Sequence, residues 1–135
     1  QAAYLSAGVW PQCESATPSQ VLMAFEERGE FGAYGGIVHI DWAARRGEVS
    51  FLCRTEVAGT AEDYARLFPA FLRLLKTVVF ARIGLRRLWA ETYDTRTGYP
   101  DALRGAGFRD EGRLRAHYLI EGRLADSVIQ GLNND

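Results

Sequence analysis

Cysteine is scarce in this sequence, and the two present are not arranged as a disulfide framework or a zinc site requires. Cys13 and Cys53 are far apart, with no CxxC pair and no second cluster of ligands. Structural zinc sites need about four ligands at short spacings, so we expect no metal. We also expect a reduced, cytoplasmic protein, because disulfide frameworks belong to oxidising compartments.

Long hydrophobic runs are also missing. A bilayer-spanning helix needs about 20 consecutive apolar residues, and no run in the sequence approaches that length. The first residues lack the basic and apolar regions of a signal peptide. The sequence therefore predicts no membrane partner. It begins with Gln1 rather than Met, as a trimmed piece of a longer protein would.

A strong charge of either sign is absent, because the net charge is -1. No overall field attracts the chain to nucleic acid or to an anionic membrane. The predicted strands also lack the basic, aromatic-rich face typical of nucleic-acid-binding sheets. Lys76 is the only lysine, so a local anion site would use arginine, although biased base composition of a genome explains the same pattern.

The sequence has the composition of one soluble globular domain. It contains 135 residues, 47% of them hydrophobic and 24% charged, which is close to the average for folded proteins. A domain of this size buries roughly two thirds of its unfolded surface, enough for a core. Residues 1 to 20 mix small and polar residues with two prolines and favour a loop with at most one short helix.

Three strands are predicted after this segment, over residues 21 to 27, 31 to 43 and 48 to 53. Tight Gly-containing turns separate them, so neighbouring strands should pair in antiparallel orientation. Gly35 and Gly36 lie inside the second strand, where glycine indicates a bulge or a close backbone approach.

A long amphipathic helix follows, with Thr60 as its expected N-cap and Gly84 as its expected end. Pro69 lies inside the pattern, where it removes a backbone hydrogen bond and predicts a kink or two abutting helices. The apolar residues recur at three- and four-residue steps and predict one stripe against a sheet. They are Tyr64, Leu67, Phe68, Phe71, Leu72, Leu75, Val78 and Val79.

The remaining pattern predicts a strand over residues 86 to 94, a short helix over 100 to 106, and a terminal hairpin. The hairpin comprises residues 112 to 120 and 124 to 132. If the long helix is a crossover, strand 86 to 94 runs parallel to strand 48 to 53. The expected fold is α/β (α+β), in the order β-β-β-α-β-α-β-β, with helices packed on a mixed, mostly antiparallel sheet.

This order, together with "LWAE", "GAGFRDEGRLR" and "EGRLADS", resembles the C-terminal two thirds of the GNAT N-acetyltransferase superfamily. The branch containing ribosomal-protein N-terminal acetyltransferases is the most similar in pattern. The resemblance covers roughly residues 21 to 132 and implies an acyltransferase domain over residues 21 to 135. The residues that match the C-terminal motif of this branch, which we call the family tail, are Gly107, Phe108, Glu111, Gly112, Arg113, Arg115, Gly122 and Asp126.

The resemblance implies an acetyl-CoA site between strand 48 to 53 and strand 86 to 94. In the family, these two strands separate to admit the pantetheine arm, and the pyrophosphate lies on backbone amides before the long helix. The corresponding residues here are Cys53, Arg54, Val57, Ala58, Gly59 and Thr60.

The phosphate-binding motif is degraded, because its first glycine falls on Val57 and only Gly59 remains. Glycine matters there because a missing Cβ lets the backbone approach a phosphate. Glu56 adds a charge of the wrong sign. An ordinary strand-to-helix turn capped by Thr60 is the alternative interpretation.

The resemblance also implies two catalytic residues. Glu91 lies seventeen positions before Phe108, where the ribosomal branch has its general base. The alternative is a sheet carboxylate paired with arginine. The tyrosine that serves as the general acid in the family corresponds to Leu103 here, which cannot donate a proton. Tyr99, about one helical turn earlier, is therefore the candidate acid. Pro100 predicts that Tyr99 lies just before the helix rather than within it.

Four other polar residues are of interest. Arg96 occupies the place of a family asparagine. His39 and His117 lie on predicted strands, where structural roles are expected. Glu48 opens a predicted strand and could orient an amine, although a solvated carboxylate at a turn is the expected role.

The resulting hypothesis is a CoA-dependent N-acyltransferase that acts on a primary amine, either a small molecule or a protein N-terminus, in a ternary complex. The alternative is a GNAT-like binding scaffold without turnover. Twenty N-terminal residues are too few for the family's first strand and two helices, which wall the acceptor pocket. Three interpretations stay open: upstream residues are missing, another subunit completes the site, or there is no acceptor site. The short N-terminal segment and the terminal hairpin are compatible with a homodimer.

Overall fold

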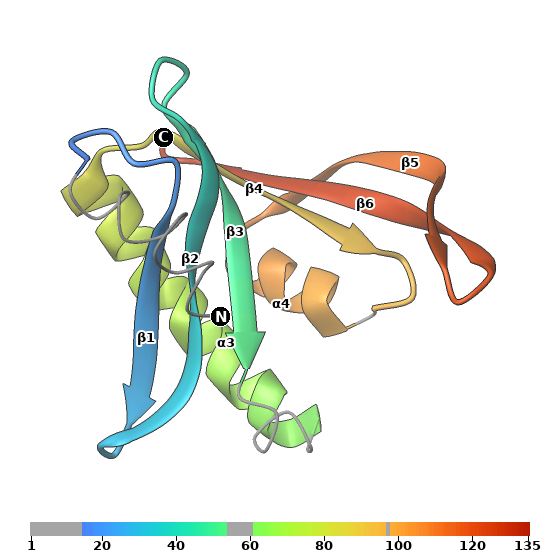
Figure 1. Cartoon of the computed structure of the whole chain (residues 1–135), viewed down its shortest axis with the longest axis horizontal. Helices are drawn as coiled ribbons and strands as arrows, with labels where there is room; N and C mark the ends of the chain where they lie inside the picture. Colours follow the sequence, from blue (N-terminus) through green and yellow to red (C-terminus); the bar gives the residue numbers. More distant parts are fainter. Residues whose placement is uncertain (1–14, 54–60, 97) are drawn as a thin grey trace.

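The computed structural model describes residues 15–53, 61–96 and 98–135, which form one six-stranded sheet with helices against it (Figure 1). The strand order is β1-β2-β3-β4-β6-β5. The elements follow the predicted succession β-β-β-α-β-α-β-β, so the predicted fold class is confirmed. The strands are β1 (Val21–Glu27), β2 (Glu30–Asp41), β3 (Arg46–Cys53), β4 (Arg87–Tyr93), β5 (Arg109–Ile120) and β6 (Arg123–Asn133). The helices are α3 (Ala61–Thr77), the π-helical segment η2 (Val78–Ile83) and α4 (Gly98–Gly105).

The first three strands pair in antiparallel orientation, as predicted. Gly35 allows a close approach, because a Cβ there would lie 2.4 Å from the Ser50 carbonyl oxygen and 2.9 Å from Phe71 Cζ. The predicted close backbone approach is therefore confirmed. A bulge at this position is not: within the β1–β2–β3 pairs, the register shifts lie at Phe25/Glu26 and between Val38 and Asp41.

Helix α3 packs its apolar stripe on one face of the sheet. Phe68 and Leu72 are fully buried, and the Phe51 ring of β3 lies 4.8 Å from the Phe68 ring. Pro69 lies inside this helix, which continues without a break from Ala61 to Thr77. The predicted division into two abutting helices is wrong, because burial of the residues around Pro69 outweighs one missing backbone hydrogen bond.

The chain leaves the long helix through η2, which ends at Gly84 as predicted. Gly84 has φ 81°, a left-handed conformation that glycine adopts without strain, and its N–H donates to the Val79 carbonyl 2.9 Å away. This turn directs the chain back across the sheet into β4.

Strands β3 and β4 are parallel, as the crossover predicted, but they pair over only three positions. The pairs are Arg46–Arg87, Gly47–Leu88 and Glu48–Trp89. Beyond them the two strands diverge, as Figure 1 shows. Strand β4 instead pairs along its whole length with β6. The sheet therefore opens at its centre, between β3 and β4, on the side where α4 lies.

The C-terminal strands form the predicted antiparallel hairpin, which extends away from the helices in Figure 1. Its turn is Glu121-Gly122, and both residues have positive φ. Strand β5 has a register shift between Leu114 and Tyr118, with Ala116 at φ 50°. A bulge of this kind bends a strand and redirects its side chains.

None of the helices within the described part of the chain is long and apolar enough to cross a membrane. The expected loop over residues 1 to 20 falls mostly on positions 1–14, which lie outside the described residues; positions 15–20 are irregular.

Candidate active site

The opening between β3 and β4 contains a cavity of about 250 Å³. We call it the central cavity. Strand β3 supplies one wall and β4 the facing wall, while α4 and β5 add further side chains. Its lining residues are Glu48, Val49, Ser50, Phe51, Glu91, Thr92, Tyr93, Arg96, Tyr99 and Tyr118. Both predicted catalytic residues, Glu91 and Tyr99, are among them.

Glu91 lies on the face of β4 opposite the helices. Burial alternates along this strand, because Ala90 and Thr92 are buried under the helices whereas Glu91 is half-buried on the other side. Its Oε1 atom is shielded from solvent and accepts no hydrogen bond from the described residues. This oxygen lies 3.5 Å from His117 Nε2, so the residue beside it is a histidine rather than an arginine. Glu91 therefore keeps one acceptor oxygen that no described residue satisfies.

Tyr99 lies inside the first turn of α4, because this helix begins at Gly98. The prediction that Tyr99 precedes the helix is wrong: Pro100 is tolerated in the first turn, where its missing N–H costs no hydrogen bond. The Tyr99 ring stacks on Phe68 with centroids 4.5 Å apart. Burial raises the pKa of Tyr99 to about 12, with Glu48 adding to the increase and Arg96 opposing it. The phenol therefore holds its proton at neutral pH.

Tyr118 lines the same cavity and was not singled out from the sequence. Burial and a hydrogen bond with the Glu91 carboxylate raise its pKa. Its ring contacts Tyr93 edge-on, with centroids 4.6 Å apart, and His117 edge-on at 4.8 Å. Alternation along a regular strand would send His117 and Tyr118 to opposite faces, so the sequence pattern alone gives no sign that both meet Glu91.

The bulge in β5 brings His117 and Tyr118 to Glu91, and Asp126 of β6 holds this bulge. The Ala116 N–H donates to Asp126 Oδ1 at 2.7 Å, and Arg113 Nε donates to Asp126 Oδ2 at 2.7 Å. Arg113 also donates to Asp94 at 2.7 Å. The Ala116 N–H and Arg113 hold the pKa of Asp126 below its usual value. Asp126 and Arg113, noted in the sequence only as part of a family tail, therefore have a structural role.

Glu48 is the third residue of β3 and forms a short hydrogen bond with His39 Nδ1. Its side chain is only 19% exposed, so the expectation of a solvated turn carboxylate is wrong. The strand begins earlier than its apolar residues indicated, because Arg46 and Gly47 also pair with β2 or β4. The structure thus places a second carboxylate beside Glu91.

Three further predicted positions have different outcomes. Leu103, at the place of the family tyrosine, is fully buried in the core. Arg96 lines the central cavity. Cys53 ends β3, with its side chain outside the described set, and Arg54, Val57, Ala58, Gly59 and Thr60 lie outside it entirely. The phosphate-binding loop therefore stays a prediction, although it connects β3 to α3 where expected.

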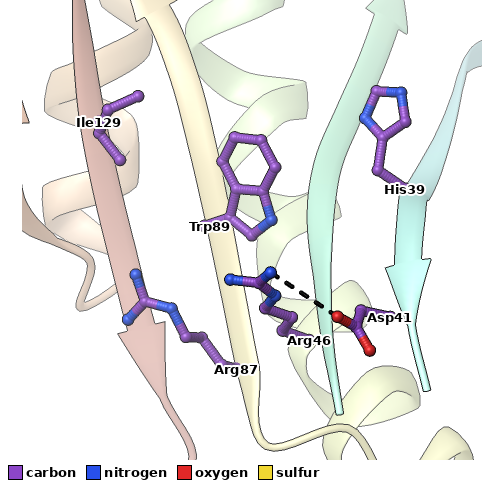
Figure 2. Close-up of a pocket in the computed structure, with 6 residues that line it drawn as sticks. All are labelled: His39, Asp41, Arg46, Arg87, Trp89 and Ile129. Atoms are coloured by element: carbon purple, nitrogen blue, oxygen red, sulfur yellow. Dashed lines mark ion pairs between the residues drawn. The ribbon is translucent and has the colours of Figure 1, made fainter. Parts of the chain in front are cut away.

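A larger cavity of about 500 Å³ adjoins the central cavity. We call it the side groove. Figure 2 shows its six lining residues on the face of the sheet turned away from the helices, which lie behind the strands. They are His39, Asp41, Arg46, Arg87, Trp89 and Ile129. The hydrogen bond between Glu48 and His39 joins the two cavities, since each residue lines one of them.

Within the described ranges, no group of three or more His, Cys, Asp or Glu side chains could hold a metal ion. The ionisable side chains that line the central cavity are two carboxylates, three tyrosines and Arg96, and a histidine contacts each carboxylate.

A mixed sheet with one diverging parallel pair, a helical crossover between the two strands of that pair and a C-terminal hairpin is the arrangement of the GNAT fold. No family model and no curated protein matches the chain. Solved structures do match. One is titled only a probable acetyltransferase; it has a TM-score of 0.76 and 18% identity, covering 99% of this chain and 74% of that one.

Other matching structures are of the spermidine N-acetyltransferase SpeG from Vibrio cholerae. A chimera of SpeG and hSSAT has a TM-score of 0.77 and 14% identity, covering 91% of this chain and 73% of the chimera. A dodecameric SpeG structure has a TM-score of 0.71 and 16% identity, covering 85% and 65%. The chain therefore has the GNAT fold, and the resemblance inferred from its sequence is confirmed at that level.

Proposed function

We propose that this protein is a CoA-dependent N-acyltransferase that transfers an acyl group, acetyl from acetyl-CoA, to a primary amine within a ternary complex. The observation that carries the proposal is the central cavity. It places a carboxylate with a free acceptor oxygen, Glu91, and a protonated phenol, Tyr99, around an opening between two diverging parallel strands. The fold of acetyltransferases supports the same reaction class.

The opening suits an extended acyl-CoA arm. Beyond the Glu48–Trp89 pair, the β3–β4 ladder no longer joins the facing edges of these strands, so backbone groups there are available to an elongated ligand. A backbone N–H at this edge can also polarise the thioester carbonyl. The seven-residue connection between β3 and α3 is the proposed place for the phosphates.

The reaction needs one base and one acid. Glu91 accepts a proton from the acceptor ammonium, directly or through water, and the neutral amine attacks the thioester carbonyl carbon. As the C–N bond forms and the C–S bond breaks, Tyr99 donates its proton to the leaving sulfur. The attacking nitrogen releases its second proton, which returns to the Tyr99 oxygen directly or through water, and the proton on Glu91 passes to solvent. Tyr118 and His117 hold the Glu91 carboxylate from the other side.

Calorimetric titration with acetyl-CoA tests the first part of the proposal. We expect heat of binding and an upward thermal shift of the protein. Absence of both at millimolar acetyl-CoA contradicts the proposal. Binding without transfer to any amine would instead identify a scaffold that has lost turnover, the alternative that the degraded phosphate motif suggests.

The variant Glu91→Gln tests the second part. The amide cannot accept the ammonium proton, so kcat should fall at least about tenfold while CoA affinity is unchanged. The matched control is Glu121→Gln, which makes the same change at the exposed turn of the hairpin and should leave kcat as it is. Loss of CoA affinity in Glu91→Gln would assign Glu91 a structural role.

A further inference from the structure

The central cavity and the side groove together carry opposite charges at their two ends. Glu48 and Glu91 form the acidic end, and each side chain is 19% exposed. Two arginines, Arg46 and Arg87, and one carboxylate, Asp41, lie at the other end, in the side groove. We call this the basic end, because arginines outnumber carboxylates in its lining. Trp89 and Ile129 lie between them as an apolar floor; Trp89 pairs with Glu48 in the sheet, and Ile129 pairs with Glu91.

The two arginines at the basic end differ in the strength of their ion pairs. Arg87 forms a two-pronged ion pair with Glu111, with Nη1 2.9 Å from Oε1, and this contact raises the pKa of Arg87. Arg46 is 55% exposed, and its Nη2 atom lies 3.7 Å from Asp41, beyond hydrogen-bond distance. Arg46 thus has only this loose ion pair with Asp41, drawn as a dashed line in Figure 2, and its exposed N–H groups can still donate to a second anion; Figure 2 shows the guanidinium directed toward Trp89.

The spacing of the two ends follows from strand geometry. Arg46 and Glu48 are two residues apart on β3, and both lie on the face opposite the buried Gly47 and Val49. Successive residues on one face of a strand are about 7 Å apart. A ligand that reaches both ends must carry its charges at roughly that separation.

We propose that the side groove binds the acceptor substrate and that this acceptor is a zwitterion. Its primary ammonium group lies at Glu48 and Glu91, and a carboxylate about 7 Å away binds Arg46. A polyamine such as spermidine, which the SpeG structures name, would instead place an ammonium beside Arg46, so the groove disfavours it. The inference rests on the proposed function for the role of Glu91, but its test uses binding alone.

Three probes with the same five-carbon chain differ only in the charge at the end that would face Arg46. They are 5-aminopentanoate, its terminal amide, and pentane-1,5-diamine. Binding to the full chain is followed by NMR of the Trp89 indole N–H, assigned with Trp89→Phe. We expect 5-aminopentanoate to bind about tenfold more tightly than the amide, because a charge-assisted hydrogen bond is lost, and the diamine to bind most weakly. Equal affinities, or tightest binding of the diamine, would overturn the proposal.

Substitution of Arg46 provides the second test. Arg46→Glu should reverse the preference so that the diamine binds more tightly than 5-aminopentanoate, and Arg46→Gln should abolish the preference without reversing it. Arg73→Glu makes the same charge change on the exposed side of α3, across the sheet, and should leave the relative affinities of the three probes unchanged. An unchanged affinity ratio in folded Arg46→Glu, checked by thermal melting, would contradict the assignment.

Acetylation assays distinguish failure of this inference from failure of the proposed function. If amines without a carboxylate are acetylated but 5-aminopentanoate neither binds nor reacts, the zwitterion assignment is wrong and the acyltransferase proposal is supported. If 5-aminopentanoate binds with the expected dependence on Arg46 but no amine is acetylated, the side groove is supported as a zwitterion-binding site and the acyltransferase proposal is wrong.

Discussion

At the scale of single residues, the chemistry of the site depends on two side chains whose environments differ. Glu91 keeps one carboxylate oxygen without a hydrogen-bond donor among the described residues, which leaves it an acceptor for a proton. Tyr99 is packed on Phe68, and the low polarity around it keeps its phenol neutral. In the proposed reaction, the cavity thus offers a proton acceptor and a proton donor, the pair that acid and base catalysis uses.

The raised pKa of Tyr99 predicts how stability depends on alkaline pH. In the unfolded chain a tyrosine ionises near pH 10, whereas Tyr99 in the folded protein stays neutral until about pH 12. The contribution of the protonated Tyr99 phenol to the free energy of unfolding is therefore complete below pH 10 and declines as pH rises toward 12. Between pH 9 and 11 the unfolding free energy of the parent should fall about 1 kcal/mol more than that of Tyr99→Phe.

Urea unfolding of both proteins at pH 9 and 11 measures this difference. Other groups titrate in the same range, but they are common to both proteins and cancel in the comparison. Equal pH dependence of the two proteins would show that Tyr99 ionises as an ordinary tyrosine.

At the scale of elements, strand β5 acts through its bulge. Asp126 accepts the Ala116 N–H and so holds the left-handed residue that directs His117 and Tyr118 to Glu91. Asp126 touches neither cavity, so it is a positioning residue. Asp126→Ala should lower kcat about tenfold with little change in CoA affinity, because only the support of Glu91 is lost.

Asp126→Asn provides the distinguishing readout, since its amide oxygen can still accept the Ala116 N–H and should restore much of the lost kcat. Glu26→Ala removes a carboxylate from β1, at the opposite edge of the sheet, as the matched control. If Asp126→Ala and Glu26→Ala have the same kcat, the bulge has no part in catalysis.

At the scale of the whole molecule, fully buried Gln130 joins three elements across the site. From β6 its Nε2 donates to the Pro100 carbonyl of α4 at 3.1 Å and to Asp110 of β5 at 2.9 Å. Gln130→Ala should lower the unfolding free energy by about 2–4 kcal/mol, because it opens a cavity and leaves a buried carbonyl unpaired. Chemical denaturation measures the loss; a change below about 0.5 kcal/mol, typical of surface sites, would contradict it.

Much of this architecture could be predicted from the sequence. The alternation of apolar residues gave β1 at its observed bounds, and the three- and four-residue stripe gave α3, since burial against one sheet face imposes these periods. Gly84 ended the helical region as its left-handed conformation requires. Glu91, which the family resemblance singled out by its spacing from Phe108, lines the central cavity, and its catalytic role stays a prediction.

The rest depended on contacts between distant segments. Tyr99 was misplaced because Pro100 signals a helix start without specifying which residue precedes it, and Glu48 was misplaced because the strand extends past its apolar residues. Tyr118 and His117 escaped detection because β5 advances four residues, from Leu114 to Tyr118, while β6 advances two, and this irregularity interrupts the regular alternation of faces. The groove around Arg46 escaped detection because its lining comes from separate strands.

By itself the sequence determined the order of elements and the pattern of burial, because both follow from local periodicity and turn residues. Tertiary structure decided which polar groups meet. Glu48, Glu91, Tyr99 and Tyr118 come from three strands and a helix, and only the divergence of β3 from β4 and the bulge in β5 bring them to one cavity. Those two features depend on pairing across the sheet, which no single segment encodes.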